Sequence, residues 1–189
     1  MIQDPAALAA MSDWALQSAC QAARQWPAAI MLTVNVARGQ ILDNKLHERV
    51  VHALNSSGLA AERLQLDFEE DILLDDQSRI APTLEALHAL GVRIAIDDFG
   101  RGATSIPRLR RYPVGAIKLD PGLVSGVGHD EASEAVVEAI GAMAGILGLK
   151  VLARGVSTRP QQDFLSALGC HLQQGPLFGK PVTVADFAN

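Results

Sequence analysis

Two adjacent carboxylates, Asp97 and Asp98, directly follow an apolar, β-branched run of the sequence. Neighbouring carboxylates repel each other unless a cation or hydrogen bonds compensate their charge. Asn35 and Asp67 end two earlier apolar runs and add hard oxygen ligands, which suit Mg²⁺, Mn²⁺ or Ca²⁺ better than zinc. An Asp-Asp pair on its own could equally form a turn or cap a helix. Because another acid ends the preceding run, the pattern favours a site of metal-binding origin.

The other apolar runs also end in polar residues, namely Lys118 with Asp120, Arg154 and Gln174. In a (β/α) barrel the carboxyl ends of all strands surround one mouth, where the chemistry takes place. In an open parallel sheet, only the strands beside the switch point need such residues. Polar turn residues would explain most of these positions singly, but they explain poorly a lysine that lies between two apolar residues. The pattern therefore favours a barrel.

Short apolar runs alternate with longer amphipathic stretches along the whole chain. The spacing predicts strands at 31–36, 64–68, 92–97, 116–120, 150–153 and 171–174. It predicts helices at 6–26, 46–54, 80–90, 131–147 and 159–168, and a short helix after Ser105. Strand-helix alternation of this kind indicates an α/β fold with a parallel sheet wrapped by helices. No linker or low-complexity stretch divides the chain, so we expect a single domain over residues 1–189.

Composition limits the classes of function. The chain has 189 residues, 49% of them hydrophobic, and a formal net charge of −5, which argues against a general nucleic-acid binder. The first residues have no signal-peptide pattern, and no stretch is long and apolar enough for a membrane span. Cys20 and Cys170 are too few for a disulfide framework and are expected to be reduced core thiols. We therefore expect a cytoplasmic domain that does not itself enter a membrane.

Several segments resemble motifs of EAL domains and occur in the same order along the chain. Residues 97–105 resemble the family pattern D-D-F-G-x-G-x-S-S, and residues 109–120 resemble L-R-R-L-P-V-D-x-L-K-I-D. Residues 34–37 resemble V-N-L-S, and residues 169–178 resemble G-C-D-x-x-Q-G-Y-L-F. The likeness runs from about Trp14 to Phe187, which is nearly the whole chain. It implies a variant TIM barrel, here incomplete with about six of the eight strands.

Active EAL domains use two divalent metals to activate a water that opens one phosphodiester of cyclic di-GMP, and the resemblance implies a role for each matching position. Asn35 and Asp67 would hold the first metal, Asp97 would bridge both metals, and Asp98 would belong to the second. Lys118 would orient the water or contact phosphate, and Glu70 would anchor the loop that starts at Asp98. The resemblance also implies ligand contacts by Asn35, Asp98, Lys118, Arg154, Gln174, Phe178 and Pro181.

The departures from the family pattern bear on activity. The signature Glu-Ala-Leu of the family's opening strand has no counterpart, and the chain begins roughly where the helix after the second strand should lie. Asp67 replaces a glutamate, and the family's A-E-G-V-E segment has Arg154 and Ser157 at its two glutamate positions. A guanidinium cannot ligate a metal. We expect Arg154 to point into the mouth and pair with Asp97 or Asp98, with a bidentate geometry possible; a solvent-facing arginine is the alternative.

These features predict a catalytically inactive EAL-like domain in cyclic di-GMP signalling, with Lys118 and Glu70 as remnants of the catalytic machinery. It would bind cyclic di-GMP or a protein partner, a second copy of itself included. No cofactor would be required, although the remnant site could hold one Mg²⁺, Mn²⁺ or Ca²⁺. One alternative is an active or weakly active cyclic di-GMP phosphodiesterase that uses divalent metal. Another is a TIM-barrel enzyme that acts on a different phosphorylated substrate.

Overall fold

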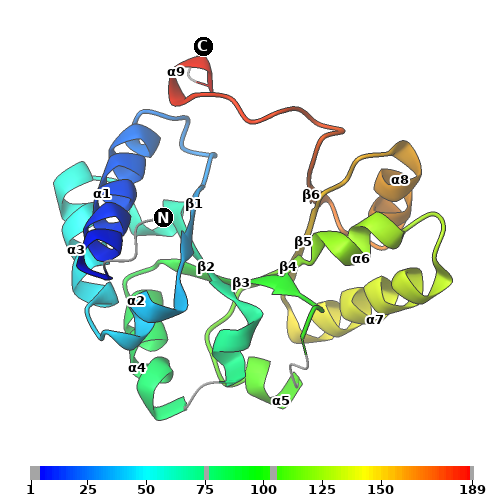
Figure 1. The fold of residues 1–189 in the computed structure, drawn as a ribbon, viewed down its shortest axis with the longest axis horizontal. Helices are drawn as coiled ribbons and strands as arrows, with labels where there is room; N and C mark the ends of the chain where they lie inside the picture. Colours follow the sequence, from blue (N-terminus) through cyan, green and yellow to red (C-terminus); the bar gives the residue numbers. More distant parts are fainter. Residues whose placement is uncertain (1–4, 75–76, 103–105, 188–189) are drawn as a thin grey trace. The chain divides into compact units, whose positions relative to one another are not determined.

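The structure is a computed structural model, and it describes residues 5–74, 77–102 and 106–187. Strands and helices alternate along the chain (Figure 1). The strands are β1 (Leu32–Val36), β2 (Leu64–Glu69), β3 (Arg93–Phe99), β4 (Ala116–Leu119), β5 (Lys150–Arg154) and β6 (Leu172–Gln174). The helices are α1 (Pro5–Arg24), α2 (Arg38–Leu42), α3 (Leu46–Ser57), α4 (Gln77–Ala89), α5 (Ile106–Leu109), α6 (Pro121–Gly126), α7 (Glu131–Leu147), α8 (Arg159–Ala167) and α9 (Val184–Phe187), with short 3-10 helices η1 (Ala61–Arg63) and η2 (Glu70–Leu74). None of the described helices is long and apolar enough to cross a lipid bilayer.

The predicted α/β alternation is confirmed, and the differences lie mainly at helix ends and in short helices. Helix α1 ends at Arg24 rather than Trp26, because the amides of Gln25 and Trp26 bond to carbonyls three residues back and leave the α-helical pattern. Helix α3 runs to Ser57 and ends at Gly58, whose φ of +69° favours glycine. Helices α2, α6 and α9 were not predicted from the sequence.

The chain divides into two compact units, of which the first comprises Met1–Phe68, Asp75–Ile94 and Val184–Asn189. Within it β1 and β2 pair in parallel, with Leu32 opposite Leu64 and Asn35 opposite Asp67. Leu64, Leu66 and Phe68 are fully buried. The register therefore places the polar ends of both strands side by side.

The turn between α1 and β1 is held by the side chain of Arg63. Its Nη2 donates to the carbonyl oxygens of Ala23, Pro27 and Ile30 at 2.9, 3.2 and 3.0 Å, and its Nε donates to Ile30 at 3.1 Å. One guanidinium thus bonds to three carbonyls at the end of a helix and in the irregular turn that follows it. This clamp fixes the direction in which the chain enters β1.

The second unit comprises Glu69–Leu74 and Ala95–Thr183. From Ala95 onward β3 pairs with β4, which pairs with β5, which pairs with β6, all in parallel. Ala95 lies opposite Ala116, but the register shifts between Ile96 and Phe99. Such an irregularity redirects side chains and is common beside functional sites. Here it falls on Asp97 and Asp98.

The backbone at and just after this irregularity adopts left-handed conformations. Asp98 has a φ of +51°, which is uncommon for a residue other than glycine, and Gly100 has a φ of +96°. A Cβ atom at Gly100 would lie 2.6 Å from Cδ1 of Leu123 and 3.0 Å from Cδ1 of Ile140. Glycine is therefore favoured at this position mainly for its conformation, and an added Cβ would also require the side chains of Leu123 and Ile140 to shift.

Cys20 offers a test of the packing of the first unit. Its side chain is fully buried, and burial raises its pKa from 9.0 to about 11. Because the folded state holds the thiol proton more tightly, this group contributes stability below pH 9 that is lost as the pH rises toward 11. Between pH 8 and pH 10 we expect Cys20 to account for a loss on the order of 1 kcal/mol in the free energy of unfolding.

Urea unfolding of the parent and of Cys20→Ala at both pH values measures this loss. The variant should be less stable at pH 8 because of the cavity, but its decline between the two pH values should be smaller by about that amount. An equal decline in both proteins would contradict the burial of the thiol.

Candidate functional site

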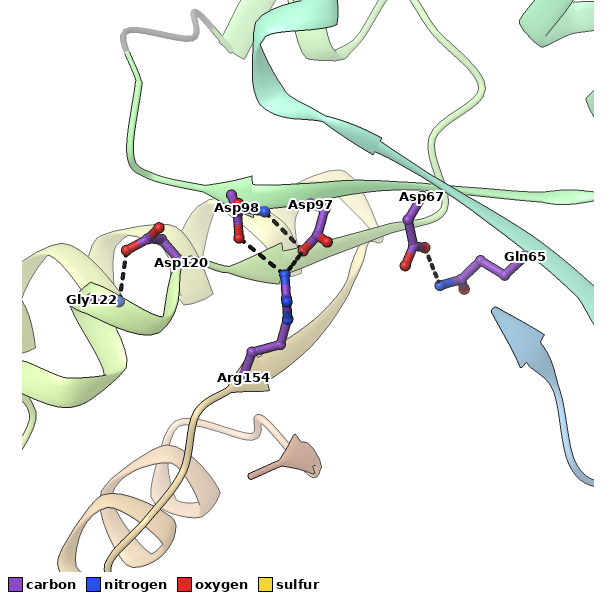
Figure 2. A network of polar contacts seen from close by, with 7 residues as sticks. All are labelled: Gln65, Asp67, Asp97, Asp98, Asp120, Gly122 and Arg154. Atoms are coloured by element: carbon purple, nitrogen blue, oxygen red, sulfur yellow. Dashed lines mark hydrogen bonds and ion pairs between the residues drawn. The ribbon is translucent and has the colours of Figure 1, made fainter. Parts of the chain in front are cut away.

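In the first unit, the predicted metal ligands Asn35 and Asp67 end neighbouring strands. They are opposite each other in the β1-β2 register. Asp67 is 2% exposed, and its Oδ1 accepts a hydrogen bond from Nε2 of Gln65 at 2.9 Å (Figure 2). The side chain of Asn35 is exposed. The two residues thus offer one buried carboxylate, partly satisfied by an amide, and one exposed amide.

In the second unit, Arg154 and the Asp97-Asp98 pair form an ionic cluster (Figure 2). Nη1 of Arg154, at the end of β5, donates to Oδ1 of Asp97 at 2.5 Å and to Oδ1 of Asp98 at 3.0 Å. The amide of Asp98 also donates to Oδ1 of Asp97 at 2.9 Å. The arginine therefore supplies the positive charge that two adjacent carboxylates need.

The geometry of this cluster differs from a bidentate pair. A single nitrogen of Arg154 serves both carboxylates, whereas a bidentate pair would use two nitrogens on one carboxylate. The β3 irregularity explains the difference, since it turns Oδ1 of Asp97 and Oδ1 of Asp98 toward one point. The alternative of an arginine that faces only solvent is wrong.

The segment after Arg154 is anchored by hydrogen bonds that were not predicted from the sequence. Oε1 of Gln161, which is 5% exposed, accepts hydrogen bonds from the amides of Ser157 and Thr158 at 2.9 and 3.1 Å and from the hydroxyl of Ser157 at 3.1 Å. The amide of Val156 donates to the carbonyl of Gln174 at 3.1 Å. The capping-box spacing from Thr158 to Gln161 was the available sequence signal.

Lys118 and Asp120, both predicted at the end of a strand, occupy different positions in the structure. Lys118 lies within β4, opposite Leu152 of β5, and is only 7% exposed. Asp120 instead follows β4 and caps helix α6, where its Oδ1 accepts from the amide of Gly122 at 2.7 Å (Figure 2). Both were predicted from the sequence among the polar residues at strand ends, but the side chain of Asp120 caps helix α6.

Glu70 holds the loop that follows the two aspartates. It is 7% exposed, and its Oε2 accepts hydrogen bonds from the amides of Gly100 at 3.1 Å and Gly102 at 2.9 Å. Residues 103–105, which complete the motif singled out in the sequence, lie outside the described residues. A carboxylate that accepts two backbone amides makes charge-assisted bonds and fixes the loop backbone where it leaves Asp98.

The remaining predicted ligand contacts lie on and after β6. Gln174 is opposite Arg154 in the β5-β6 register, so both side chains emerge on the same face at neighbouring strand ends. Gln174, Phe178 and Pro181 are all exposed. The amide of Phe178 closes a turn by donating to the carbonyl of Gly175 at 3.0 Å. These positions offer an amide and two apolar surfaces to solvent.

The carboxylates of the second unit do not fit a divalent metal in this arrangement. One oxygen of Asp97 and one of Asp98 are bonded to Arg154, and a guanidinium has no lone pair for a metal. Within the described residues, no group of three or more His, Cys, Asp or Glu side chains is arranged to hold a metal ion. The cation that these two carboxylates bind is the arginine itself.

Together, these features define an α/β domain of the (β/α)-barrel type with acidic residues at its strand ends. The model of the EAL domain matches residues 1–181, and the chain belongs to this family. The cyclic di-GMP phosphodiesterase NbdA of Pseudomonas aeruginosa is 38% identical over 179 residues, which are 93% of this chain but 23% of NbdA. The chain thus spans about a quarter of that relative.

Solved structures agree with this assignment. A PaMucR phosphodiesterase structure in complex with c-di-GMP is 35% identical, with a TM-score of 0.92 over 96% of this chain and 75% of that chain. A calcium and cyclic di-GMP complex of BlrP1 from Klebsiella pneumoniae is 27% identical, with a TM-score of 0.83 over 90% of this chain and 44% of that chain. The predicted fold of EAL-domain type is confirmed.

The family's name-giving tripeptide occurs in this sequence, but in a helix. Glu85-Ala86-Leu87 lies within α4, where Leu84 and Leu87 are fully buried and Glu85 is exposed. Spacing of this kind is typical of an amphipathic helix that packs its leucines into a core. This tripeptide therefore does not supply the strand glutamate of the family pattern.

The contacts of Glu70 give a first prediction for the site. Glu70→Ala removes the acceptor of two backbone amides, and we expect the free energy of unfolding to fall by about 1–3 kcal/mol. Hydrogen exchange at Gly100 and Gly102 should become faster in this variant. Glu70→Gln keeps one acceptor oxygen and should lie between the parent and the alanine variant. Unchanged exchange at both glycines would contradict the anchoring role.

The metal fit can be tested by returning a carboxylate to position 154. Arg154→Glu places three carboxylates where two are now neutralised, so in EDTA the variant should lose about 1–3 kcal/mol of stability. Ca²⁺ or Mn²⁺ at about ten times its Kd should restore about 1.4 kcal/mol.

Thermal unfolding with and without the ion measures this effect. The parent and Arg154→Gln, which removes the cation without adding a ligand, serve as controls. An equal metal response in the parent would show that its aspartates already bind the ion.

Proposed function

We propose that this chain is a catalytically inactive EAL domain that takes part in cyclic di-GMP signalling by binding cyclic di-GMP. The observation that carries the proposal is the contact of Arg154 Nη1 with both Asp97 and Asp98. In a two-metal mechanism, divalent ions generate hydroxide and clamp the attacking and leaving oxygens. A guanidinium neutralises the same carboxylates but lowers the pKa of no water, so the hydrolytic step has no activated nucleophile.

The nature of the ligand is supported by the relatives. NbdA is named a cyclic di-GMP phosphodiesterase, and the structures of PaMucR and BlrP1 are complexes with that dinucleotide. In our proposal Arg154 and Lys118 supply positive charge to phosphate, Asn35, Asp98 and Gln174 supply polar contacts, and Phe178 and Pro181 supply apolar surface. Asn35, Asp67, Asp97 and Asp98 would be what remains of the metal site, and Lys118 and Glu70 what remains of the catalytic machinery.

A protein partner, a second copy of the chain included, is a second candidate for what this domain binds. We propose that residues 1–189 form one EAL-like domain. In each of its two compact units, large apolar side chains are exposed to solvent. Trp14 on α1 is 70% exposed, and Ile146 on α7 is 86% exposed. Exposed apolar surface of this kind marks interaction sites when it is contiguous. Sedimentation of the purified chain tests the homodimer directly.

Turnover separates the proposed function from an active phosphodiesterase. The pure protein is incubated with cyclic di-GMP and Mg²⁺ or Mn²⁺, and the linear dinucleotide is followed by chromatography. We expect no more linear product than in a reaction without enzyme, because Arg154 is bonded to Asp97 and Asp98, the carboxylates that would hold the second metal. An active EAL domain assayed in parallel is the positive control. Metal-dependent accumulation of linear product would overturn the proposal and favour the active alternative.

A further inference from the structure

Arg154 uses only part of its hydrogen-bonding capacity in the cluster. A guanidinium carries five N–H donors, and here the two on Nη1 serve Asp97 and Asp98. Nε and Nη2 have no hydrogen-bond partner among the residues that the structure describes. The side chain is 32% exposed, so these donors are within reach of a solute.

The donors that remain free have the geometry of an anion receptor. The hydrogens of Nε and Nη2 lie along one edge of the planar guanidinium and match two oxygens of a phosphate or carboxylate. The opposite side of the group is held by two aspartates that belong to a different strand, β3 (Figure 2). The side chain is thus fixed before any ligand arrives, which reduces the entropy lost on binding.

The neighbours of Arg154 differ in charge. Its Nη1 offsets the charge of the two aspartates at close range, and Lys118 on the neighbouring strand β4 adds a second positive charge to this unit. Gln174 lies opposite Arg154 in register and exposes an amide on the same face. Gln174 thus offers an uncharged amide at the strand end next to that of Arg154.

We propose that Arg154 binds a phosphodiester of the ligand directly through Nε and Nη2, in place of a metal ion, and that ligand binding by this chain needs no divalent cation. This inference rests on the proposed function, because it specifies how the same site holds cyclic di-GMP. It assigns Arg154 two tasks, one for each side of the guanidinium. Nη1 replaces the metal charge at the aspartates, and the opposite edge replaces the metal contact to phosphate.

Calorimetric titration of cyclic di-GMP tests the inference in two buffers, one with EDTA and one with Mn²⁺. We expect the parent to bind with Kd values that agree within about threefold, since a hydrogen-bonded guanidinium needs no metal. Arg154→Gln should weaken binding about tenfold to a hundredfold in both buffers, the usual cost of losing bonds to a charged group. Arg154→Lys keeps the charge beside the aspartates but lacks the two-donor edge, so it should fall between these two proteins.

Arg159→Gln is the matched control. Arg159 is an exposed arginine at the start of α8 that donates to Oε1 of Gln162, and its loss changes the net charge equally. This variant should bind like the parent. Circular dichroism of each variant before titration verifies that it is folded, and the lysine variant serves if the glutamine variant is not.

The outcomes separate the inference from the function on which it rests. Binding that requires Mn²⁺ overturns the metal-independent inference but leaves a cyclic di-GMP-binding domain in place. Equal affinity of the parent and both Arg154 variants in EDTA overturns the role of Arg154 alone. No binding by the parent in either buffer overturns the inference together with cyclic di-GMP as the ligand.

Discussion

The ionic contact between Arg154 and the Asp97-Asp98 pair is the constraint on which the second unit's site depends. Two consecutive carboxylates, one with its backbone in a left-handed conformation, repel each other unless a cation or hydrogen bonds compensate their charge. Here that cation is part of the chain, so its occupancy is independent of ion concentration. The contact joins the end of β5 to the end of β3, and it fixes both aspartates in one orientation.

The surroundings of Arg154 are built to hold it in place. Gln161 closes the turn that follows, and Val156 is bonded to the carbonyl of Gln174 on β6. On the other side, Glu70 accepts the amides of Gly100 and Gly102 and restrains the loop after the aspartates. Both partners of the ionic contact thus rest on backbone that is hydrogen-bonded to buried side chains. Such support is what a binding site needs in order to be preorganised.

Much of this architecture could be predicted from the sequence, because apolar runs, glycine caps and strand-end polarity are local patterns. Lys118 between apolar neighbours and Asp97-Asp98 after a β-branched run both pointed to a strand-end site. The β3 irregularity could not be predicted, since it depends on pairing with β4. For the same reason the use of one nitrogen of Arg154 for two carboxylates was missed. Asp120 was misread because its role follows from the Pro121 that begins the next helix.

A divalent metal in a phosphodiesterase site does two separable things: it neutralises carboxylates and binds phosphate, and it acidifies a water molecule. A guanidinium can do the first through its charge and its N–H donors, but not the second, because it offers no coordination site to water. In the proposed function, an arginine at position 154 in place of the family's glutamate would therefore remove the activated water while it keeps an attraction for anions. Without a cation, Asp97 and Asp98 would repel each other and destabilise the fold. Beside Arg154 they retain a role, because they orient its side chain. On this proposal, a single side chain would separate the recognition of a phosphodiester from its hydrolysis.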